Sequence, residues 1–382
     1  MPIDKNILME VSKFHPARSM PFDFLYKGLM AEVEAGNVNM SKDPTGELEL
    51  FDYSLQCQFA GNWNVFTLMS RGLILCPGQK KIVSMCLPKF LNIQELEFWT
   101  PNESFTTTEK VDGSCLFLFF WKNEWHCSTR GSFVSDQAKW ALAWAKNNIK
   151  LDGLNPNLTY ICEVIYPENR VVVKYDWSGL VLLTAFDLLT GEEQDYQNLS
   201  SSLKDFGFRF LKQYDFSYTD EIVSLCEKSP TDEDGLYALS SNEEGFVVKF
   251  KNGLRMKIKG KQYLLAHKAK NSLSPLSAWE SAMLCQDMTE TMKLLPDEFF
   301  QEWSNLVEVF NKKFANKMKE IKEDHLATLD MTDKELGMSS HPQKNFIFAA
   351  RKNNLLTEAY KPGKCRSSVF NTFRPKANIL EK

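Results

Sequence analysis

The 382-residue sequence contains no long run of apolar residues. Its longest apolar stretches, residues 116–121 and 179–186, are far shorter than the roughly 20 residues that cross a bilayer. The first residues, Met-Pro-Ile-Asp-Lys, have no apolar core of a secretory signal. These absences predict a protein that works without a membrane.

Paired cysteines are also missing. The nine cysteines are an odd number, and they form no Cys-x-x-Cys motif and no Cys/His spacing typical of a zinc site. We therefore expect neither a disulfide framework nor a structural zinc ion. Thiols that stay reduced predict an intracellular location, in the cytoplasm or the nucleus.

The chain has no excess of positive charge, because 45 Lys and Arg stand against 49 Asp and Glu, a net charge of −4. This balance argues against a protein whose whole surface binds nucleic acid, but it allows a local basic channel. Residues 249–270 contain no acid, and their lysines alternate with apolar residues, which is typical of a strand face. The segment from Lys344 onward is basic too, and it is equally typical of a solvated surface.

The spacing of apolar and turn residues predicts two domains. Paired strands are expected at 72–76 and 81–86, at 114–121 and 124–129, and at 244–250 and 254–259. Further strands are expected at 158–165, 170–175 and 180–188, and helices at 133–149 and 219–228.

Beyond about residue 265 the apolar spacing becomes helical. We expect helices over 274–295 and from 297 onward, then further short helices and a basic, poorly structured tail. The sequence thus predicts an α+β domain over residues 1–265 and a helical C-terminal domain with a basic tail over 266–382.

The most informative motif is Lys110-Val-Asp112-Gly113-Ser, which places a lysine, a carboxylate and a glycine at the mouth of a predicted strand. The motif alone is weak evidence. Further on, Lys257 and Lys259 lie two residues apart, so both leave one face of a strand, which suits a polyphosphate. We expect such cations to lower the pKa of Lys110 and make it a nucleophile.

Two carboxylates complete the set. Glu163, within a predicted strand, and Glu244, before a glycine, are suited to bind a ribose hydroxyl or hydrated magnesium. Each member also has a simpler interpretation: a solvated strand face for the two lysines, a paired structural acid for Glu163 and a turn for Glu244. Their joint occurrence favours a nucleotide site.

This ordered set resembles the motifs of covalent nucleotidyltransferases, the polynucleotide ligases and mRNA capping enzymes. Five more segments resemble the phage-type RNA ligase 1 family: Phe51-Asp-Tyr53, Ser70-Arg71-Gly, Pro88-Lys89-Phe-Leu-Asn, Arg130-Gly-Ser and Glu163-Val-Ile-Tyr-Pro-Glu-Asn-Arg170. Arg130 stands where that family has lysine. The resemblance covers about residues 50–265. It implies an antiparallel-sheet adenylylation domain followed by an all-helical C-terminal domain.

The resemblance implies an ATP-dependent RNA ligase. Lys110 would take AMP from ATP and pass it to an RNA 5′-phosphate, which a 3′-hydroxyl then attacks. The resemblance implies that Tyr53, Arg71 and Lys89 line the nucleotide and its β- and γ-phosphates, and that Glu109 also belongs to this nucleotide site. It implies that Glu163 binds the ribose and that Glu244 supports the metal and the chemical steps. Lys257 and Lys259 would bind the α-phosphate. Mg²⁺ (or Mn²⁺), held through water near Glu163 and Glu244, would neutralise the leaving pyrophosphate.

No Gly-x-x-x-x-Gly-Lys-Ser/Thr motif and no paired His-x-Thr motif is present. We therefore expect no kinase or cyclic phosphodiesterase module in this chain. The RNA ends that it joins, tRNA ends among them, would then be prepared in trans by other enzymes. The expected role is RNA repair or tRNA splicing, with RNA selected by the residues after about 270.

Three alternatives stay open. A capping guanylyltransferase or DNA ligase would usually continue into a β-rich OB domain after the Lys-x-Lys strand, where this chain turns helical. The ligase domain of fungal-type tRNA ligases, which needs a 2′-phosphate end, has similar motifs. A catalytically silent RNA-binding scaffold would not need Lys110, Glu163, Lys257 and Lys259.

Overall fold

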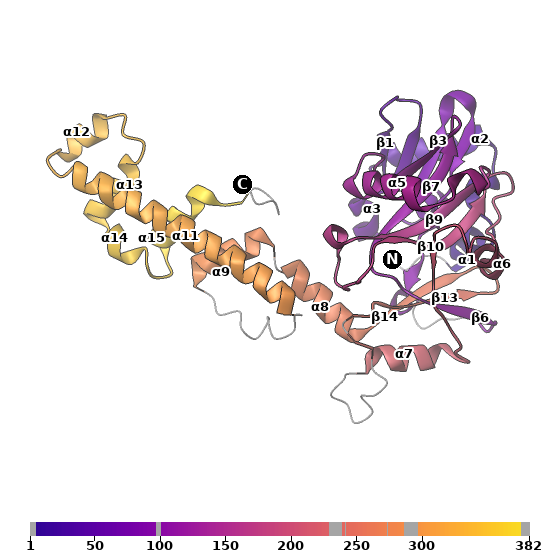
Figure 1. Ribbon diagram of the computed structural model, residues 1–382. Coiled ribbons are helices and arrows are strands. Elements are labelled where there is room, and N and C mark those ends of the chain that lie inside the picture. The colour runs from indigo at the N-terminus through magenta and orange to yellow at the C-terminus, as the bar shows by residue number, and fades with distance from the viewer. Residues whose placement is uncertain are drawn as a thin grey trace. The chain divides into compact units, whose positions relative to one another are not determined.

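The computed structural model describes residues 5–96, 101–228, 239–240, 242–272, 274–285 and 297–375. The chain forms two compact units, Met1–Leu264 and Leu265–Lys382 (Figure 1). This division lies one residue from the boundary that the sequence predicts. No helix in the described ranges is long and apolar enough to span a bilayer.

Three sheets form the first unit. The first sheet, in the order β1-β2-β3-β4, is antiparallel and consists of β1 (Val38–Lys42), β2 (Glu49–Tyr53), β3 (Arg71–Cys76) and β4 (Lys81–Ser84). The second, in the order β11-β10-β9-β7-β8, consists of β7 (Ser114–Trp121), β8 (Glu124–Thr129), β9 (Leu158–Ile165), β10 (Gly179–Asp187) and β11 (Arg209–Phe210).

The third sheet has the order β12-β6-β13-β14-β5. It contains β5 (Leu91–Asn92), β6 (Phe105–Glu109), β12 (Gln213–Tyr214), β13 (Gly245–Phe250) and β14 (Arg255–Lys259). All pairs in the second and third sheets are antiparallel except two short parallel pairs, β10 with β11 and β14 with β5. The structure thus confirms the α+β class, with largely antiparallel sheets.

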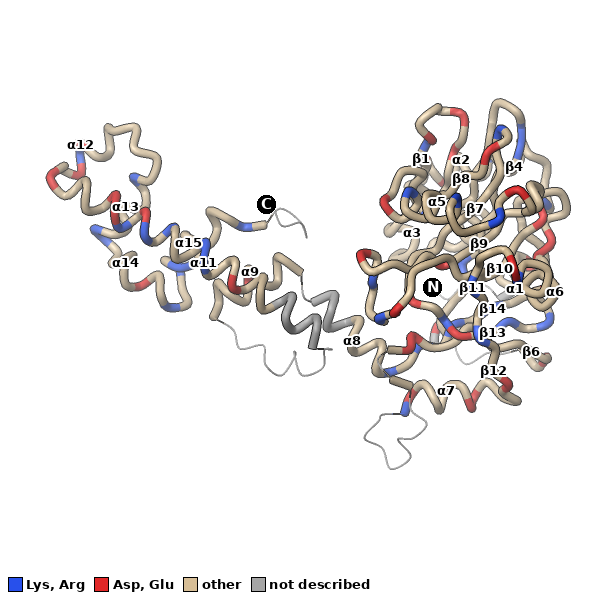
Figure 2. The backbone as a smooth tube through the Cα atoms, in the orientation of Figure 1, with Lys and Arg blue, Asp and Glu red and all other residues tan. Residues whose placement is uncertain are grey.

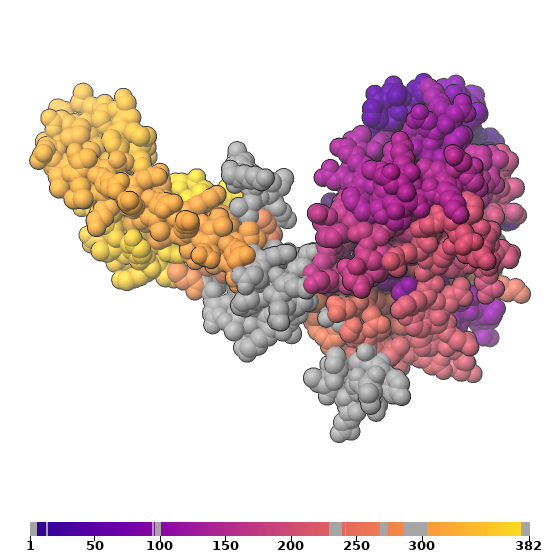
Figure 3. Space-filling view, in the orientation of Figure 1, coloured from indigo at the N-terminus to yellow at the C-terminus, as the bar shows by residue number. Residues whose placement is uncertain are grey.

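Helices pack around these sheets. They are α1 (Lys5–Lys13), α2 (Phe22–Glu34), α3 (Leu55–Ala60), α4 (Val65–Met69), α5 (Asp136–Asn148), α6 (Tyr196–Ser202) and α7 (Thr219–Glu227). Helix α7 lies beside β14. Figure 3 shows mostly early residues, in indigo to purple, at one end of this unit and mostly later residues, in red to orange, at the other. Helix α8 (Lys261–Ser272) crosses the boundary between the two units.

Strand β7 explains why its sequence is apolar without alternation. Phe117 and Phe119 point into the core shared with the first sheet, whereas Leu116 and Leu118 point into a second core with α5. All four side chains are at most 1% exposed. A strand covered on both faces favours a continuous apolar run.

The three predicted hairpins and the helices at 136–148 and 219–227 are confirmed. The predicted strand over residues 170–175 is wrong. There the backbone N–H groups of Val172 and Val173 donate to Oδ2 of Asp112, at 2.7 and 2.8 Å, so a side chain takes the place of a partner strand. The β-branched residues of that segment favour a strand, but they do not predict a hydrogen bond to a distant side chain.

The second unit is helical, as predicted. It contains α9 (Pro275–Leu284), α11 (Asp297–Ala327), α12 (Asp333–Met338), α13 (Lys344–Lys352), α14 (Leu355–Glu358) and α15 (Lys364–Phe370). Phe310, Phe314, Met318 and Ile321 recur at three- and four-residue spacing on α11 and are buried in its core. The part of the predicted helix at 286–295 and the tail at 376–382 lie outside the described residues.

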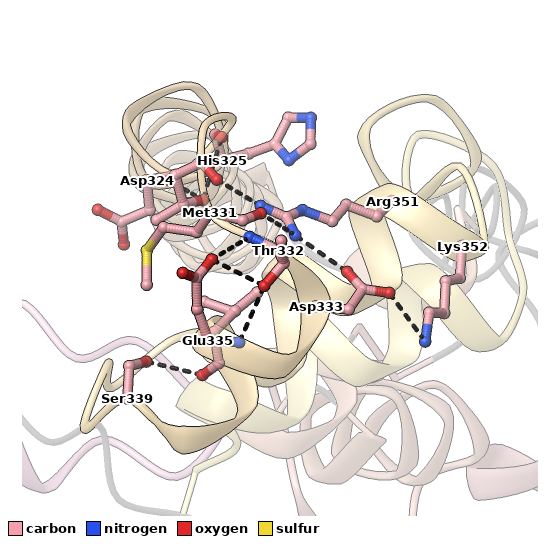
Figure 4. Close-up of polar contacts among 11 residues, drawn as sticks. Asp324, His325, Met331, Thr332, Asp333, Glu335, Ser339, Arg351 and Lys352 are labelled. Atoms are coloured by element: carbon pink, nitrogen blue, oxygen red, sulfur yellow. Dashed lines mark hydrogen bonds and ion pairs between the residues drawn. The ribbon is translucent and has the colours of Figure 1, made fainter.

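Several basic residues of this unit have partners within it. Arg351 donates to the carbonyl oxygens of Thr328 and Met331 and pairs with Asp333 at 2.9 Å, and Lys352 pairs with the same carboxylate at 3.3 Å (Figure 4). These contacts tie α13 to the end of α11 and the start of α12. Arg351 and Lys352 therefore help to hold the helices of this unit together.

Candidate active site

Lys110 lies directly after β6, where its backbone N–H donates to the carbonyl oxygen of Gly245 at 2.8 Å. The loop that follows is anchored by Asp112, whose buried carboxylate accepts hydrogen bonds from the N–H groups of residues 172 and 173 and from the Tyr263 hydroxyl. Segments far apart in the sequence thus fix the position of the lysine.

Gly113 lets a carboxylate approach this loop. A Cβ atom there would lie 2.6 Å from the Val164 carbonyl oxygen and 3.1 Å from Cγ of Glu163, so a larger residue would displace the strand. The backbone N–H of Gly113 donates to Oε1 of Glu163 at 3.2 Å. The glycine of the motif therefore brings Glu163, on β9, to the lysine loop.

Glu244 bridges two lysines. Its Oε2 lies 2.8 Å from Nζ of Lys110, and its Oε1 lies 2.8 Å from Nζ of Lys259. Burial favours the neutral carboxyl group, but Lys110 and Lys259 outweigh it and lower the pKa of Glu244. The carboxylate is therefore ionised and held by two cations.

The pKa of Lys110 differs from the expectation drawn from the sequence. Burial disfavours its charged form, but the carboxylates of Glu244 and Glu163 outweigh burial and raise the pKa of Lys110 above its ordinary value. The expectation of a lowered pKa is wrong, because sequence spacing does not show that Glu244 lies between the two lysines.

The neighbouring cations lower the pKa of Lys257 rather than that of Lys110. Burial, Arg71 and Lys110 lower the pKa of Lys257 to about 8. On β14 the buried side chains of Met256 and Ile258 point to one face, so Lys257 and Lys259 share the other.

Glu163 also has a shifted pKa. Burial raises the pKa of this carboxyl group to about 7; the charge of Lys110 opposes the rise and that of Glu244 adds to it. Carboxyl groups whose pKa is shifted toward neutral pH by burial and neighbouring charges are enriched in functional sites.

Aromatic rings and cations gather around Tyr53. Nζ of Lys89 lies 5.2 Å from the centroid of the Tyr53 ring and 4.6 Å from that of Trp63. Arg130 donates to the Tyr53 hydroxyl at 3.0 Å and pairs with Asp52 at 3.0 Å. Trp63 was missed in the sequence because it belongs to no recognised motif, and Asp52 was given no role although it lies within the Phe51-Asp-Tyr53 segment.

A cavity of about 560 Å³ lies between the second and third sheets. Four of the predicted site residues line it: Arg71, Glu109, Lys110 and Glu163. Its volume is in the range of small-molecule sites. Lys257, whose pKa responds to Lys110 and Arg71, and Lys259, paired with Glu244, lie close by. Lys89 lines a neighbouring cavity, and the Glu109 carboxylate accepts the backbone N–H of Lys212.

The described part of the chain contains no group of three or more His, Cys, Asp or Glu side chains arranged to hold a metal ion. Glu163 and Glu244 offer carboxylate oxygens near the lysine. This donor set suits Mg²⁺ that keeps most of its waters and takes its other ligands from phosphates.

Comparison with known proteins identifies this arrangement. A family model described as RNA ligase, of the phage T4 RNA ligase 1 type, matches residues 69–273, more than half of the chain. The chain belongs to this RNA ligase family. The matched range contains Arg71, Lys110, Glu163, Lys257 and Lys259, whereas Tyr53 lies before it.

Two relatives of this RNA ligase family member are similar over part of their length. A protein of the Autographa californica nuclear polyhedrosis virus, named as a bifunctional polynucleotide kinase/RNA ligase, is 28% identical over 227 residues, which are 52% of this chain and 30% of that protein. An RNA ligase of Rhodothermus phage RM378 is 27% identical over 182 residues, 36% of this chain and 41% of its own. The chain thus matches less than half of either relative.

Solved structures are similar at low identity. An archaeal ATP-dependent RNA ligase (form 2) aligns with a TM-score of 0.49 and 14% identity over 78% of this chain and 83% of its own. The Naegleria gruberi RNA ligase with PPi aligns with a TM-score of 0.35 and 22% identity over 44% and 52%.

Proposed function

We propose that this protein is an ATP-dependent RNA ligase that joins RNA 5′-phosphate and 3′-hydroxyl ends through a lysyl-AMP intermediate on Lys110. One observation carries the proposal: Lys110 lies in a cavity between two carboxylates, on a loop that buried hydrogen bonds hold in place. Membership of the RNA ligase family supports it.

In the first step the neutral amine of Lys110 attacks the α-phosphorus of ATP. The bond from this phosphorus to the bridging oxygen breaks, pyrophosphate leaves, and a P–N bond forms. The proton of the amine passes to Glu244, whose Oε2 lies 2.8 Å away. Lys257 and Lys259 stabilise the charge on the α-phosphate, and Arg71 and Lys89 bind the leaving phosphates.

In the second step an oxygen of the RNA 5′-phosphate attacks the same phosphorus and the P–N bond breaks, which regenerates the lysine. In the third step a 3′-hydroxyl attacks the RNA phosphorus, and AMP leaves as the phosphodiester forms. Glu163 binds the ribose of the nucleotide, Tyr53 lines its site, and Glu109 holds the strand that presents Lys110.

Mg²⁺, with Mn²⁺ as a substitute, would lie near Glu163 and Glu244 and supply positive charge that neutralises the leaving pyrophosphate. The second unit selects the RNA. We assign the protein to RNA repair or to tRNA splicing or repair, on ends that other enzymes prepare. All nine cysteines are free, which supports a reducing cytoplasmic or nuclear location.

The decisive experiment is incubation with ATP or GTP labelled at the α-phosphate, followed by denaturing electrophoresis. The wild-type protein should take up label from ATP alone, and Lys110→Ala should take up none while remaining folded by circular dichroism. Lys80→Ala, which changes an exposed ion pair with Asp23, is the matched control and should label normally. Label on Lys110→Ala would contradict the assignment, and label from GTP would favour a capping enzyme.

A sealing assay separates the remaining alternatives. An RNA ligase of the proposed type should seal ends that have no 2′-phosphate. If sealing requires the 2′-phosphate, the protein acts as a fungal-type tRNA ligase. If neither labelling nor sealing occurs in the folded wild type, it is an RNA-binding scaffold.

A further inference from the structure

A second cavity, of about 440 Å³, adjoins the one that contains Lys110. Helix α1 and the loop after it form one side of it, and the β13–β14 hairpin forms another. Phe90, Lys249, Lys251 and Arg255 line both cavities, so the two share a wall. Of the motifs discussed above only Pro88-Lys89-Phe90 reaches this second cavity, and no role has been given to its α1 side or to the β13–β14 hairpin.

The charge of the cavity favours an anion. Four cations line it, namely Lys89, Lys249, Lys251 and Arg255, against two carboxylates, Glu192 and Glu193. Lys249 lies on β13 and Arg255 on β14, where Figure 2 shows basic positions in blue. Positive charge therefore remains in excess.

One of the two carboxylates is already neutralised. Glu193 is paired with Arg255 and lies 2.9 Å from Nζ of Lys249. Burial is outweighed by these two cations, which lower the pKa of Glu193 to about 2. The carboxylate thus holds Arg255 and Lys249 in place, while Lys251, on the same face of the hairpin two residues beyond Lys249, is exposed to solvent.

Spacing and aromatic rings narrow the class of anion. Lys249, on β13, and Lys251, directly after that strand, both line the cavity and are two residues apart, roughly 7 Å in an extended chain, which is comparable with the distance between successive phosphates of a nucleic-acid strand. The cavity also contains Phe14, whose side chain is 53% exposed, and Phe90. Exposed rings beside a basic groove are typical of sites that stack bases of a single strand.

We propose that this second cavity binds the RNA strand next to the end being joined, with Lys251 and its neighbours on the hairpin contacting backbone phosphates and Phe14 stacking a base. The inference rests on the proposed function, because the ligation steps require an RNA end to reach Lys110 from an adjoining site. The shared wall of cations gives a strand a continuous path between the two cavities.

The test compares two exposed substitutions, Phe14→Ala and Lys251→Ala, in the full chain. Phe59→Ala, at a ring that is 83% exposed on α3 and outside the cavity, and Lys80→Ala are the matched controls. Lysyl-AMP formation from labelled ATP should stay within about twofold of wild type in Phe14→Ala and in both controls, because none of these residues lines the cavity that contains Lys110. Only these three variants test the ATP step, because Lys251 lines both cavities.

Sealing of a pre-adenylylated single-stranded RNA, which bypasses the ATP step, should distinguish the two cavity variants from the two controls. Phe14→Ala and Lys251→Ala should raise the KM for RNA about tenfold with little change in kcat, since stacking and phosphate contacts act on binding. Lys251→Ala should also reduce the slope of log affinity against log salt by about 0.7, the value for one phosphate contact of a single strand.

An unchanged KM for RNA in both variants would overturn the proposal. A raised KM for ATP would overturn it as well, because the cavity would then serve the nucleotide. If the wild type forms no lysyl-AMP, the proposed function fails, and binding of a fluorescent 5′-phosphorylated RNA to the same variants still tests the RNA subsite on its own.

Discussion

The Nζ atom of Lys110 lies 2.8 Å from Oε2 of Glu244. The carboxylate stabilises the protonated amine, which is not a nucleophile, and it is also the nearest acceptor for the proton that must leave. The same contact thus restrains the lysine before ATP binds and serves the reaction afterwards.

This dual effect predicts a change in the pH dependence of Glu244→Gln. The neutral fraction of Lys110 increases with pH, and loss of the carboxylate lowers the pKa of Lys110, so the midpoint of lysyl-AMP formation should move to lower pH. The maximal rate should fall about 10²-fold because the proton acceptor is lost. Single-turnover rates between about pH 7 and 11.5, a range that extends above the ordinary pKa of lysine, measure both effects. A midpoint that stays in place would show that Glu244 does not control the lysine.

A second prediction concerns stability. The pKa of Glu163 is about 7 in the folded protein and lower in the unfolded chain, so the folded state binds the proton more tightly. Stability from this group is therefore present at low pH and is lost as the pH rises to about 7. The side chain of Glu163→Gln stays neutral at every pH. Near pH 8 the free energy of unfolding of this variant, measured by urea denaturation, should exceed that of wild type by about 1–3 kcal/mol. The variant should also lose lysyl-AMP formation.

The control for Glu163→Gln is the same comparison near pH 4, where both proteins carry a neutral group and the difference should vanish. A variant less stable than wild type at pH 8 would mean that the buried carboxylate stabilises the fold. The amide of Gln is about as large as the carboxyl group of Glu, and its oxygen can still accept the hydrogen bond from the Gly113 N–H. The substitution therefore tests the effect of the negative charge alone.

The sequence predicted local features of this molecule better than distant ones. The hairpins and the shared face of Lys257 and Lys259 depend on turn residues and on strand alternation, both of which are visible in a short window. The raised pKa of Lys110 depends on Glu244, which is 134 residues away. The missing strand after Arg170 depends in the same way on Asp112, and no spacing rule predicts such contacts.

Asp112 gives a third prediction, because it anchors the lysine loop. Asp112→Ala leaves the N–H groups of Val172 and Val173 and the Tyr263 hydroxyl without this acceptor, at a cost of about 2–5 kcal/mol. Asp112→Asn keeps an acceptor oxygen of the same size and should cost less than half as much. Urea unfolding of the two variants gives this difference, and equal losses would show that charge rather than hydrogen bonding anchors the loop.

The last prediction concerns the helical unit. A chain that ends at Ser272 retains the whole of α8, which crosses the boundary between the units, and every residue of the proposed site. It should form lysyl-AMP at a rate within a few-fold of the full chain, because the catalytic contacts lie within Met1–Leu264. It should seal a broken tRNA loop poorly, and a simple single strand with a smaller loss, since the second unit is proposed to contact structured RNA. Raising the salt should narrow the gap between the two proteins if those contacts are to phosphates. The division of labour is wrong if the folded, shortened protein cannot react with ATP, or if it seals both substrates as well as the full chain does.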